Sequence, residues 1–313
     1  RSVFGSKSSG KSLKKLFPNF SNIPDLIIGD ESEYDQEHSD ITFLCLPNTK
    51  SQYLIKKYKF TKIIDLSADF RIENIESYRN WYDLEHILPE KLTEFTYGLT
   101  ELNRTNISKT NYVANPGCYP TSVLIPLIPL LQENIIPDID HIIIDSKSGL
   151  SGAGKSLKEN NLFSEVNENF SVYNVEKHRH LGEIKQELGK YKKDLKVTFT
   201  PHLLPITRGI LSTIYVKKNG IELSKINRFF NNYFKDEPFI KFDKNNGYPD
   251  TKSVRGTNNL NFKVYEDYDS SQIIIVSCID NIIKGAAGQA VQNMNVMFGI
   301  NELESLLFTK IEP

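Results

Sequence analysis

The sequence predicts an α/β protein in which a domain with a parallel sheet is followed by an α+β domain with a mixed or antiparallel sheet. Residues 41–66 have a strand–helix–strand pattern, which is typical of parallel sheets. After His141 the pattern changes to long apolar strands with fewer helices between them, as in α+β domains. A chain of 313 residues is long enough for about two such domains.

The first half of the chain contains the predicted parallel sheet. The apolar run 41–46 predicts a strand buried on both faces, and 62–66 predicts its neighbour. A helix is expected between them over 53–60. Residues 1–22 contain only a short helical pattern. Residues 73–111 mix charged and aromatic side chains with little periodicity, so we expect a surface excursion with short helices there.

The second half contains most of the predicted long strands. A helix over 285–294 has small residues on one face, which favour close packing, so we expect it to pack on the first domain. The first domain would then comprise residues 1–116 and 285–313. The second, a catalytic and oligomerisation domain, would comprise residues 117–284. Its predicted strands are 141–146, 195–200, 210–217 and 271–279.

The composition excludes several classes of partner. The 38 basic and 39 acidic residues give a net charge of −1, which does not indicate binding to nucleic acid or to an anionic membrane. The three cysteines are an odd number without short spacings, which favours a reducing compartment, such as the cytoplasm, over a disulfide framework. The longest apolar stretch, 123–131, contains two prolines and is too short to span a bilayer.

The stretch Asn115–Thr121 contains the strongest catalytic candidate, Cys118. A Pro-Gly pair just before it predicts a sharp turn that leads into a helix. Unpaired N–H groups and the helix dipole at such a position favour the thiolate, which is the nucleophilic form. The same N–H groups could bind an oxyanion. The alternative is a buried apolar cysteine, which we expect for Cys45 and Cys278.

Two further segments contain candidates for proton transfer and binding. His202 lies between prolines at a strand end and could accept the thiol proton, or it could be a histidine hydrogen-bonded at the strand end. Arg208 follows it, and its planar fork suits a carboxylate or a phosphate. His178, Arg179 and His180 form either a cationic patch for an anionic substrate or a solvated surface, and their spacing does not suit zinc.

The segment Gly149–Ser156 matches the phosphate-binding pattern G-x-x-x-x-G-K-[ST]. The residues that follow lack an apolar helical face, and no later strand offers an evident Mg²⁺ ligand, so nucleotide hydrolysis is disfavoured. A flexible glycine-rich loop that approaches a ligand closely is the favoured alternative.

Taken together, these motifs resemble those of the N-acetyl-gamma-glutamyl-phosphate reductases of arginine biosynthesis, in the aspartate-semialdehyde-dehydrogenase-like superfamily. The resemblance covers nearly the whole chain and implies a Rossmann-type NADP-binding domain beside a catalytic domain. It rests on seven stretches in the family's order: Asp65–Arg71, Tyr97–Glu101, Ala114–Thr121, Ser148–Lys155, His178–His180, Pro201–Ile210 and Asp280–Ala290.

The resemblance also implies a reaction. Cys118 would attack an acyl phosphate and expel phosphate, and NADPH would reduce the resulting thioester to N-acetylglutamate 5-semialdehyde. A carbonyl held on a fixed sulfur is oriented for hydride transfer. His202 would serve as the acid–base, and Arg208, Arg179 and His178 would hold the anionic groups of the substrate.

Cofactor contacts follow from the resemblance in the same way. The family opens with a strand and a glycine-rich turn, which we expect to precede Arg1. Arg1 and Ser2 would then meet the 2′-phosphate of NADP. The family's usual His-Gly pair is Asn48-Thr49 here. No metal is expected. The other expected cofactor contacts are Ser67, Ser151, Gly152 and Asn281.

Other functions fit parts of the pattern. A related acyl-phosphate reductase, of the aspartate-semialdehyde or N-acetyl-aminoadipyl-phosphate type, would share this fold and chemistry, although the Pro-Gly-Cys-Tyr-Pro-Thr stretch fits the arginine enzyme better. A cysteine hydrolase or acyltransferase would use Cys118 and His202 without a nicotinamide, and a non-catalytic binding protein is a third alternative. For the reductase we expect a small-molecule substrate and a homodimer or homotetramer, with neither nucleic acid nor membrane as a partner.

Overall fold

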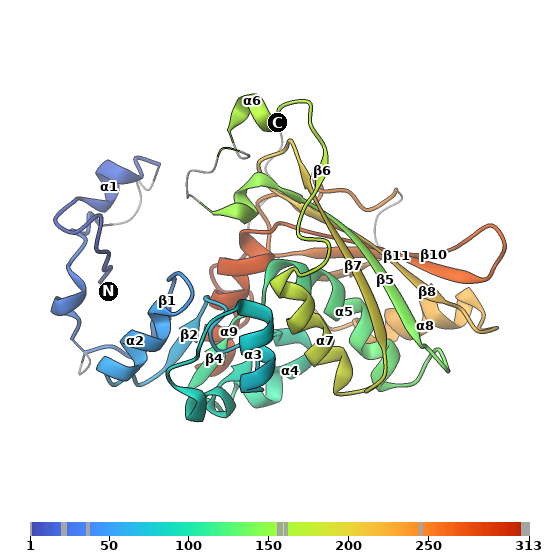
Figure 1. The fold of residues 1–313 in the computed structure, drawn as a ribbon, viewed down its shortest axis with the longest axis horizontal. Helices are drawn as coiled ribbons and strands as arrows, with labels where there is room; N and C mark the ends of the chain where they lie inside the picture. Colours follow the sequence, from blue (N-terminus) through green and yellow to red (C-terminus); the bar gives the residue numbers. More distant parts are fainter. Residues whose placement is uncertain are drawn as a thin grey trace.

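The computed structural model describes residues 2–19, 24–35, 38–154, 159, 162–243 and 247–307. The strands in this part of the chain form two sheets, one with four strands and one with seven. Figure 1 shows the smaller sheet and its helices on one side of the molecule and the larger sheet, with helices below it, on the other. Both halves of the predicted fold class are confirmed.

The smaller sheet is parallel throughout. Its strands lie in the order β1 (Thr42–Leu44), β2 (Ile63–Asp65), β4 (Tyr112–Ala114) and β3 (Thr96–Tyr97). Successive residues of a strand point to opposite faces. Ile63 therefore packs in one core and Ile64 in another, on the two sides of the sheet.

Helices cover both faces of the smaller sheet. Side chains from α2 (Lys50–Lys57) pack on the face of Ile63. Side chains from α4 (Thr100–Ile107) and α9 (Gly288–Met297) pack on the opposite face. The C-terminal helix thus returns to the first sheet, as its small residues indicated, and it is preceded by a π-helical turn, η5 (Ile283–Ala287).

The short helices expected over 73–111 are confirmed, but the expected surface excursion is wrong. This segment contains α3 (Ile75–Tyr82), η2 (Pro89–Glu94), β3 and α4. Its aromatic side chains belong to the core: Tyr78 and Phe95 are buried, and the ring of Phe95 stacks on Phe70 with 4.0 Å between centroids. Short elements joined by turns contribute one or two core residues each, so no helical or strand period appears in the sequence.

The larger sheet is mixed, with parallel pairs β5/β7 and β9/β10 among antiparallel neighbours. Its order is β6 (Ser171–Val172), β7 (Lys196–Leu204), β5 (His141–Gly149), β8 (Ile210–Lys217), β11 (Gln272–Ile279), β10 (Leu260–Glu266) and β9 (Ile240–Phe242). Three helices pack on one face of it: α5 (Cys118–Gln132), α7 (Arg179–Gly189) and α8 (Leu223–Tyr233). The remaining short elements are α1 (Leu13–Leu16), η1 (Glu31–Glu33), η3 (Leu150–Ala153) and α6 (Phe163–Val166).

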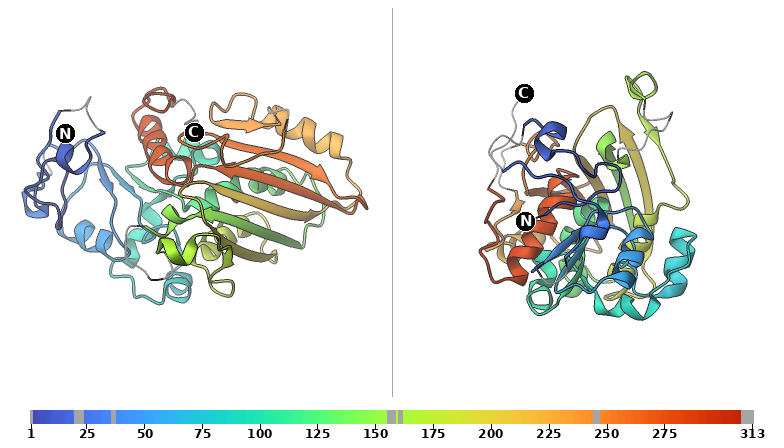
Figure 2. Two further views of the ribbon diagram at one scale, coloured as in Figure 1. Left: turned by 90° about the horizontal axis from the view of Figure 1, so that it is seen from above. Right: turned by 90° about the vertical axis from the view of Figure 1, so that its left-hand side faces the viewer.

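The opposite face of the larger sheet is open. Figure 2 (left) looks onto this face, where the strands lie uncovered over much of their length. Ile143, Tyr215, Ile274 and Tyr265 form one row across β5, β8, β11 and β10, because each is paired in register with the next. All four side chains are partly or well exposed. An apolar row of this kind on a sheet face is unusual for a surface that meets only water.

The two cysteines expected to be buried differ from each other. Cys278 on β11 is buried as expected. Cys45 is exposed, and the run 41–46 is only partly buried. The reason is its place in the fold: β1 is an edge strand of the smaller sheet, so it lacks a neighbour on one side within the described residues.

Thr49, which stands where the resembling family usually has glycine, has a φ of 73° at the N-cap of α2. A β-branched residue is strained in this left-handed region, whereas glycine is not. The Thr49 N–H donates to Asp69 Oδ1 at 2.8 Å, and this bond holds the backbone there. The strain comes from the backbone conformation and is independent of the side chain's neighbours.

We predict that Thr49→Gly raises the free energy of unfolding by about 0.5–1 kcal/mol, because relief of left-handed strain exceeds the added flexibility of the unfolded chain. Denaturant unfolding of the variant and the parent measures this. The matched control is Thr105→Gly on the exposed side of α4, which should lower stability by a similar amount, because glycine weakens a helix. A lower stability for Thr49→Gly would contradict the prediction.

Candidate active site

Cys118 is the first residue of α5, and Gly117 is its N-cap with an extended backbone. The predicted placement of this cysteine at a helix start is therefore correct. Its surroundings are tightly packed: a Cβ added to Gly285 of η5 would lie 2.7 Å from Cys118 Cβ. The side chain of Asn115 donates to the Ala286 carbonyl at 3.1 Å. The turn before the cysteine is thus fixed against η5.

Glu183 of α7 ties this turn to the first domain. Its Oε1 accepts hydrogen bonds from Tyr97 Oη on β3 at 2.6 Å and from the Gly117 N–H at 2.8 Å. The side chain of Glu183 has no exposed surface. We did not assign Glu183 or Tyr97 a role from the sequence. The sequence did contain one signal for Glu183: it is an acidic residue between two apolar residues, Leu181 and Ile184, both of which are buried on α7.

Arg71 supplies a positive charge to the same region. Only 8 % of its side chain is exposed, and its Nη1 lies 3.6 Å from Glu183 Oε2. Its Nη2 donates to the Leu66 carbonyl at 2.9 Å. Its Nε is buried and has no hydrogen-bond partner among the described residues. Arg71 closes the Asp65–Arg71 motif, yet sequence reasoning gave it no role.

The histidine pair lies on the Cys118 side of the larger sheet. His178 is the N-cap of α7, and its Nδ1 accepts from the His180 N–H at 3.1 Å. A Cβ added to Gly117 would lie 2.7 Å from His180 Nε2, so this imidazole lies against the turn that carries Cys118. His180 Nδ1 is buried and without a hydrogen-bond partner in the described part of the chain. Arg179, between them, is exposed.

Burial has the largest effect on the pKa values of Cys118, His178 and His180. It raises the pKa of the Cys118 thiol to about 11, although Arg71, the Tyr119 N–H and Arg179 act to lower it. The expectation that the helix start alone would leave an acidic thiol is therefore wrong, because burial outweighs it. Burial also lowers the pKa of His178 to about 4 and that of His180 well below its usual range. At neutral pH the thiol and both imidazoles are uncharged.

His202 lies on the other face of the larger sheet. It is paired in register with Lys147, and its Nδ1 lies 3.0 Å from Asp145 Oδ1 on β5. The alternate residues of β5 face α5, as shown by the contact of Ser146 with Ser212 and of Ser212 with Ser122 of α5. The predicted pairing of Cys118 with the imidazole of His202 therefore does not hold, because the sheet separates them.

Several other predicted residues do come together. Asn281 Nδ2 donates to Ser151 Oγ at 2.9 Å, and Asn281 Oδ1 accepts from the Gly209 N–H at 2.7 Å. Arg208 Nη2 lies 3.1 Å from both carboxylate oxygens of the buried Asp280. Ser151, Gly152, Asn281 and Arg208 thus form one polar cluster immediately before η5.

The glycine-rich loop packs on its own chain. A Cβ added to Gly149 would lie 2.8 Å from the Ile206 carbonyl oxygen and 2.9 Å from the Arg208 nitrogen. The loop continues as the short 3₁₀ turn η3, not as an α-helix, and the structure describes it only as far as Gly154. Contact with a neighbouring loop therefore explains why glycine is needed at position 149, the first residue of the loop, and a bound phosphate is not required for this.

The remaining predicted cofactor residues lie farther along the first domain. Ser67 follows β2, and its hydroxyl donates to Asp65 Oδ2 at 2.7 Å. Asp65 is buried, which raises its pKa to about 6. Ser2 is exposed, and Arg1 lies outside the described residues. Within the described residues, neither Ser2 nor Ser67 makes a hydrogen bond to Ser151 or Asn281.

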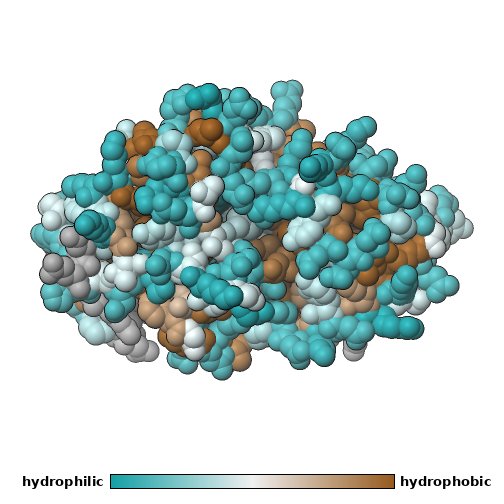
Figure 3. All heavy atoms as spheres, turned by 90° about the horizontal axis from the view of Figure 1, so that it is seen from below, coloured by the Kyte–Doolittle hydropathy of each residue, from teal (hydrophilic) through white to brown (hydrophobic). Residues whose placement is uncertain are grey.

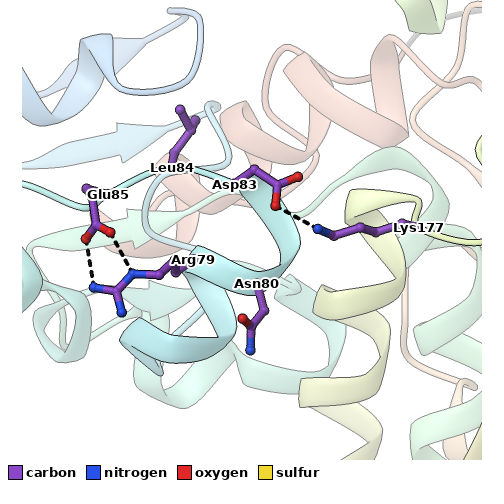
Figure 4. Close-up of a pocket in the computed structure, with 6 residues that line it drawn as sticks. All are labelled: Arg79, Asn80, Asp83, Leu84, Glu85 and Lys177. Atoms are coloured by element: carbon purple, nitrogen blue, oxygen red, sulfur yellow. Dashed lines mark hydrogen bonds and ion pairs between the residues drawn. The ribbon is translucent and has the colours of Figure 1, made fainter.

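A separate cavity of ≈ 340 Å³ lies between α3 and the start of α7 (Figure 4). Its charged side chains pair with one another, Arg79 with Glu85 and Asp83 with Lys177, and all four are exposed. No unpaired charge of this set is therefore directed at a ligand. Figure 3, seen from below, shows mostly hydrophilic residues on that side of the molecule, with apolar residues between them.

Comparison with known proteins identifies both halves of the chain. Residues 1–110 match the family model "Semialdehyde dehydrogenase, NAD binding domain", and residues 118–281 match "Semialdehyde dehydrogenase, dimerisation domain". The chain is 42% identical over 312 residues to "Probable N-acetyl-gamma-glutamyl-phosphate reductase, chloroplastic" of Arabidopsis thaliana, covering 98% of this chain and 77% of that protein. It is 43% identical over 309 residues to "N-acetyl-gamma-glutamyl-phosphate reductase" of Magnetococcus marinus, covering 97% and 88%.

Solved structures share the fold at low identity. Aspartate semialdehyde dehydrogenase II of Vibrio cholerae, complexed with ASA, has a TM-score of 0.69 and 17% identity, covering 94% of this chain and 88% of that one. Aspartate semialdehyde dehydrogenase of Candida albicans with NADP has a TM-score of 0.63 and 14% identity, covering 94% and 89%. Within the described residues, no helix has both the length and the apolar character needed to span a membrane.

We predict that alkylation of Cys118 by iodoacetamide accelerates about tenfold per pH unit between pH 7.5 and 9.5, because only the thiolate reacts and its pKa is about 11. Site-resolved mass spectrometry separates this residue from the exposed Cys45. Arg71→Met removes a positive charge that lowers the pKa, so the reaction at fixed pH should become slower. A rate that reaches a plateau below pH 8 would contradict the raised pKa.

Proposed function

This chain belongs to the N-acetyl-gamma-glutamyl-phosphate reductases, a family of NADP-dependent oxidoreductases, and we propose that it reduces N-acetylglutamyl 5-phosphate through a thioester on Cys118 in arginine biosynthesis. The observation that carries the mechanism is the junction of Cys118, His180, Arg71 and Glu183 at the start of α5. It combines a nucleophile, a neutral imidazole and a buried positive charge in one place.

The acyl transfer uses groups of this junction. The Cys118 sulfur forms a bond to the acyl carbon, the bond from that carbon to the phosphate oxygen breaks, and phosphate leaves. His180 accepts the thiol proton, since its imidazole is neutral and lies against the Cys118 turn. The first N–H groups of α5 stabilise the oxyanion, as helix starts do for developing negative charge. Arg71 offsets the charge of the phosphate with its unpaired Nε.

Reduction requires NADPH, which supplies a hydride to the thioester carbon. The proposed contacts Ser151, Gly152 and Asn281 fit this need, because their cluster directly precedes η5, and η5 packs on Cys118. Ser67 lies just beyond the carboxyl end of a parallel strand, where such sheets bind ligands. Arg1 and Ser2 stay proposals from the resemblance. When the bond between carbon and sulfur breaks to release the aldehyde, the proton on His180 returns to Cys118.

Recognition of the remaining anionic groups falls to arginines at the edge of the site. Arg208 is aligned by Asp280 and keeps its Nε buried and without a hydrogen bond in the described part of the chain. Arg179 is exposed, and its charge acts on Cys118. We propose that these two residues hold the substrate carboxylate. His178 supports His180 by capping α7 and need not touch the substrate.

We also propose that the chain forms a homodimer through the open face of the larger sheet. The support is the apolar row of Ile143, Tyr215, Ile274 and Tyr265, which lies in the segment matched by the dimerisation-domain family. Burial of such a row against a second copy would remove apolar surface from water. The proposed two-fold contact would place like residues against each other.

We predict that Cys118→Ser lowers turnover by about 10³-fold or more and that His180→Asn lowers kcat by about 10²–10⁴-fold, because these residues supply the nucleophile and the base. The matched control His202→Asn should retain most activity, since His202 lies on the other face of the sheet. The assay follows NADPH formation from N-acetylglutamate 5-semialdehyde, NADP and phosphate. Unchanged activity of Cys118→Ser would exclude the thioester, and NADPH formation without phosphate would exclude acyl-phosphate chemistry.

For the assembly, we predict that Ile143→Glu shifts the protein to the mass of a monomer in light scattering at micromolar concentration, because a charge on the open face opposes burial. The control is Tyr53→Glu, which changes an exposed apolar residue of α2 in the first domain and should leave the mass unchanged. A dimer that persists in Ile143→Glu would place the contact elsewhere.

A further inference from the structure

The turn η5, which packs on Cys118, takes part in a buried ion pair between Lys284 and Glu101. Lys284, the second residue of η5, is fully buried, and its Nζ lies 2.5 Å from Glu101 Oε1 of α4 and 2.8 Å from Gln292 Oε1 of α9. Glu101 Oε1 also accepts from Gln292 Nε2 at 2.9 Å. Glu101 Oε2 has no hydrogen bond among the described residues. Neither charge touches Cys118.

The helical register of η5 determines which residue packs against Cβ and Cα of Cys118. A Cβ on Gly285 would lie 2.7 Å from Cys118 Cβ and 3.2 Å from its Cα, so no other residue fits at this point of contact. A π-helical turn contains one residue more than an α-helical turn; such turns are rare, and they occur frequently at functional sites. Relaxation of η5 to an α-helix would turn Gly285 away and bring a side chain toward Cys118.

Stability alone does not account for the ion pair. Two charges taken out of water lose hydration that their attraction repays only in part, and apolar replacements of such pairs are often as stable or more so. What a buried pair can provide is a single allowed register, because any shift would leave a charge without its partner. Lys284 is the residue directly before Gly285, so its pairing fixes the turn where it meets the cysteine.

Resting on the proposed role of Cys118, we propose that Lys284 and Glu101 are positioning residues for the nucleophile: their pairing holds η5 in its π-helical register and so keeps Gly285 packed against Cys118. The pair acts through η5, together with two other contacts of that turn. These are the bond from Asn115 Nδ2 to the Ala286 carbonyl and the carboxylate of Asp280, which accepts from the N–H groups of Ile282 and Ile283.

The test compares Lys284→Met, Glu101→Gln and the double variant. Each single change leaves one buried charge without its partner and should therefore lower the unfolding midpoint. The double change removes both charges and should recover most of the midpoint. If the pair positions the nucleophile, the double variant still loses at least tenfold in kcat with little change in KM, and its Cys118 alkylation rate differs at least threefold from that of the parent. Recovery of kcat and of the alkylation rate together with the midpoint would overturn the proposal.

Two further variants complete the design. Lys218→Met with Glu266→Gln removes a partly buried ion pair between the end of β8 and β10, in another part of the larger sheet, and should leave Cys118 alkylation unchanged. Gln292→Met removes an acceptor of Lys284 and a donor to Glu101 and Glu302, but it leaves Lys284 and Glu101 paired with each other. It should therefore change alkylation in the same direction as the double variant, even if that variant folds poorly. An unchanged alkylation rate in Gln292→Met and in the double variant would overturn the proposal. Alkylation needs no turnover, so this outcome is distinct from a failure of Cys118→Ser to lose activity.

Discussion

The carboxylate of Glu183 is the constraint on which the rest of the site depends. A buried charge must be hydrogen-bonded and paired, or it will not stay ionised. Here the partners come from three separate segments: Tyr97 from the parallel sheet, the Gly117 amide from the turn before α5, and Arg71 from the loop after β2. One group on α7 therefore sets the relative positions of both domains and of the nucleophile.

The second condition for the site is that segments approach each other closely at glycines, which have no side chain. Gly117 leaves room for His180 and Glu183, and Gly285 leaves room for Cys118. On the outer side of α7, a Cβ on Gly182 would lie 2.4 Å from the indole of Trp81, so the helix can approach α3 only with glycine at this position. The glycines around the site thus mark contacts between segments that are distant in the sequence, and their role is steric, since none of the three has a positive φ.

The sequence was informative where chemistry and local structure coincide. The Pro-Gly turn before Cys118 and the long apolar strands after His141 could be interpreted directly, and the structure agrees with both. Reasoning from sequence selected His202 because a histidine between prolines looks unusual, but only the strand register shows that it faces away from α5. Glu183 and Arg71 were missed because their importance comes from meeting across 112 positions of chain, which no local pattern reveals.

The larger sheet separates the proposed reacting groups from the proposed contact between copies of the chain. On the α5 side lie Cys118 and His180, and on the open side lies the apolar row that begins at Ile143. A layer of hydrogen-bonded backbone stands between them. Substitutions that alter how copies associate can therefore accumulate on one side while the reacting groups stay undisturbed on the other. Such a partition allows quaternary structure to diverge during evolution at little cost to turnover.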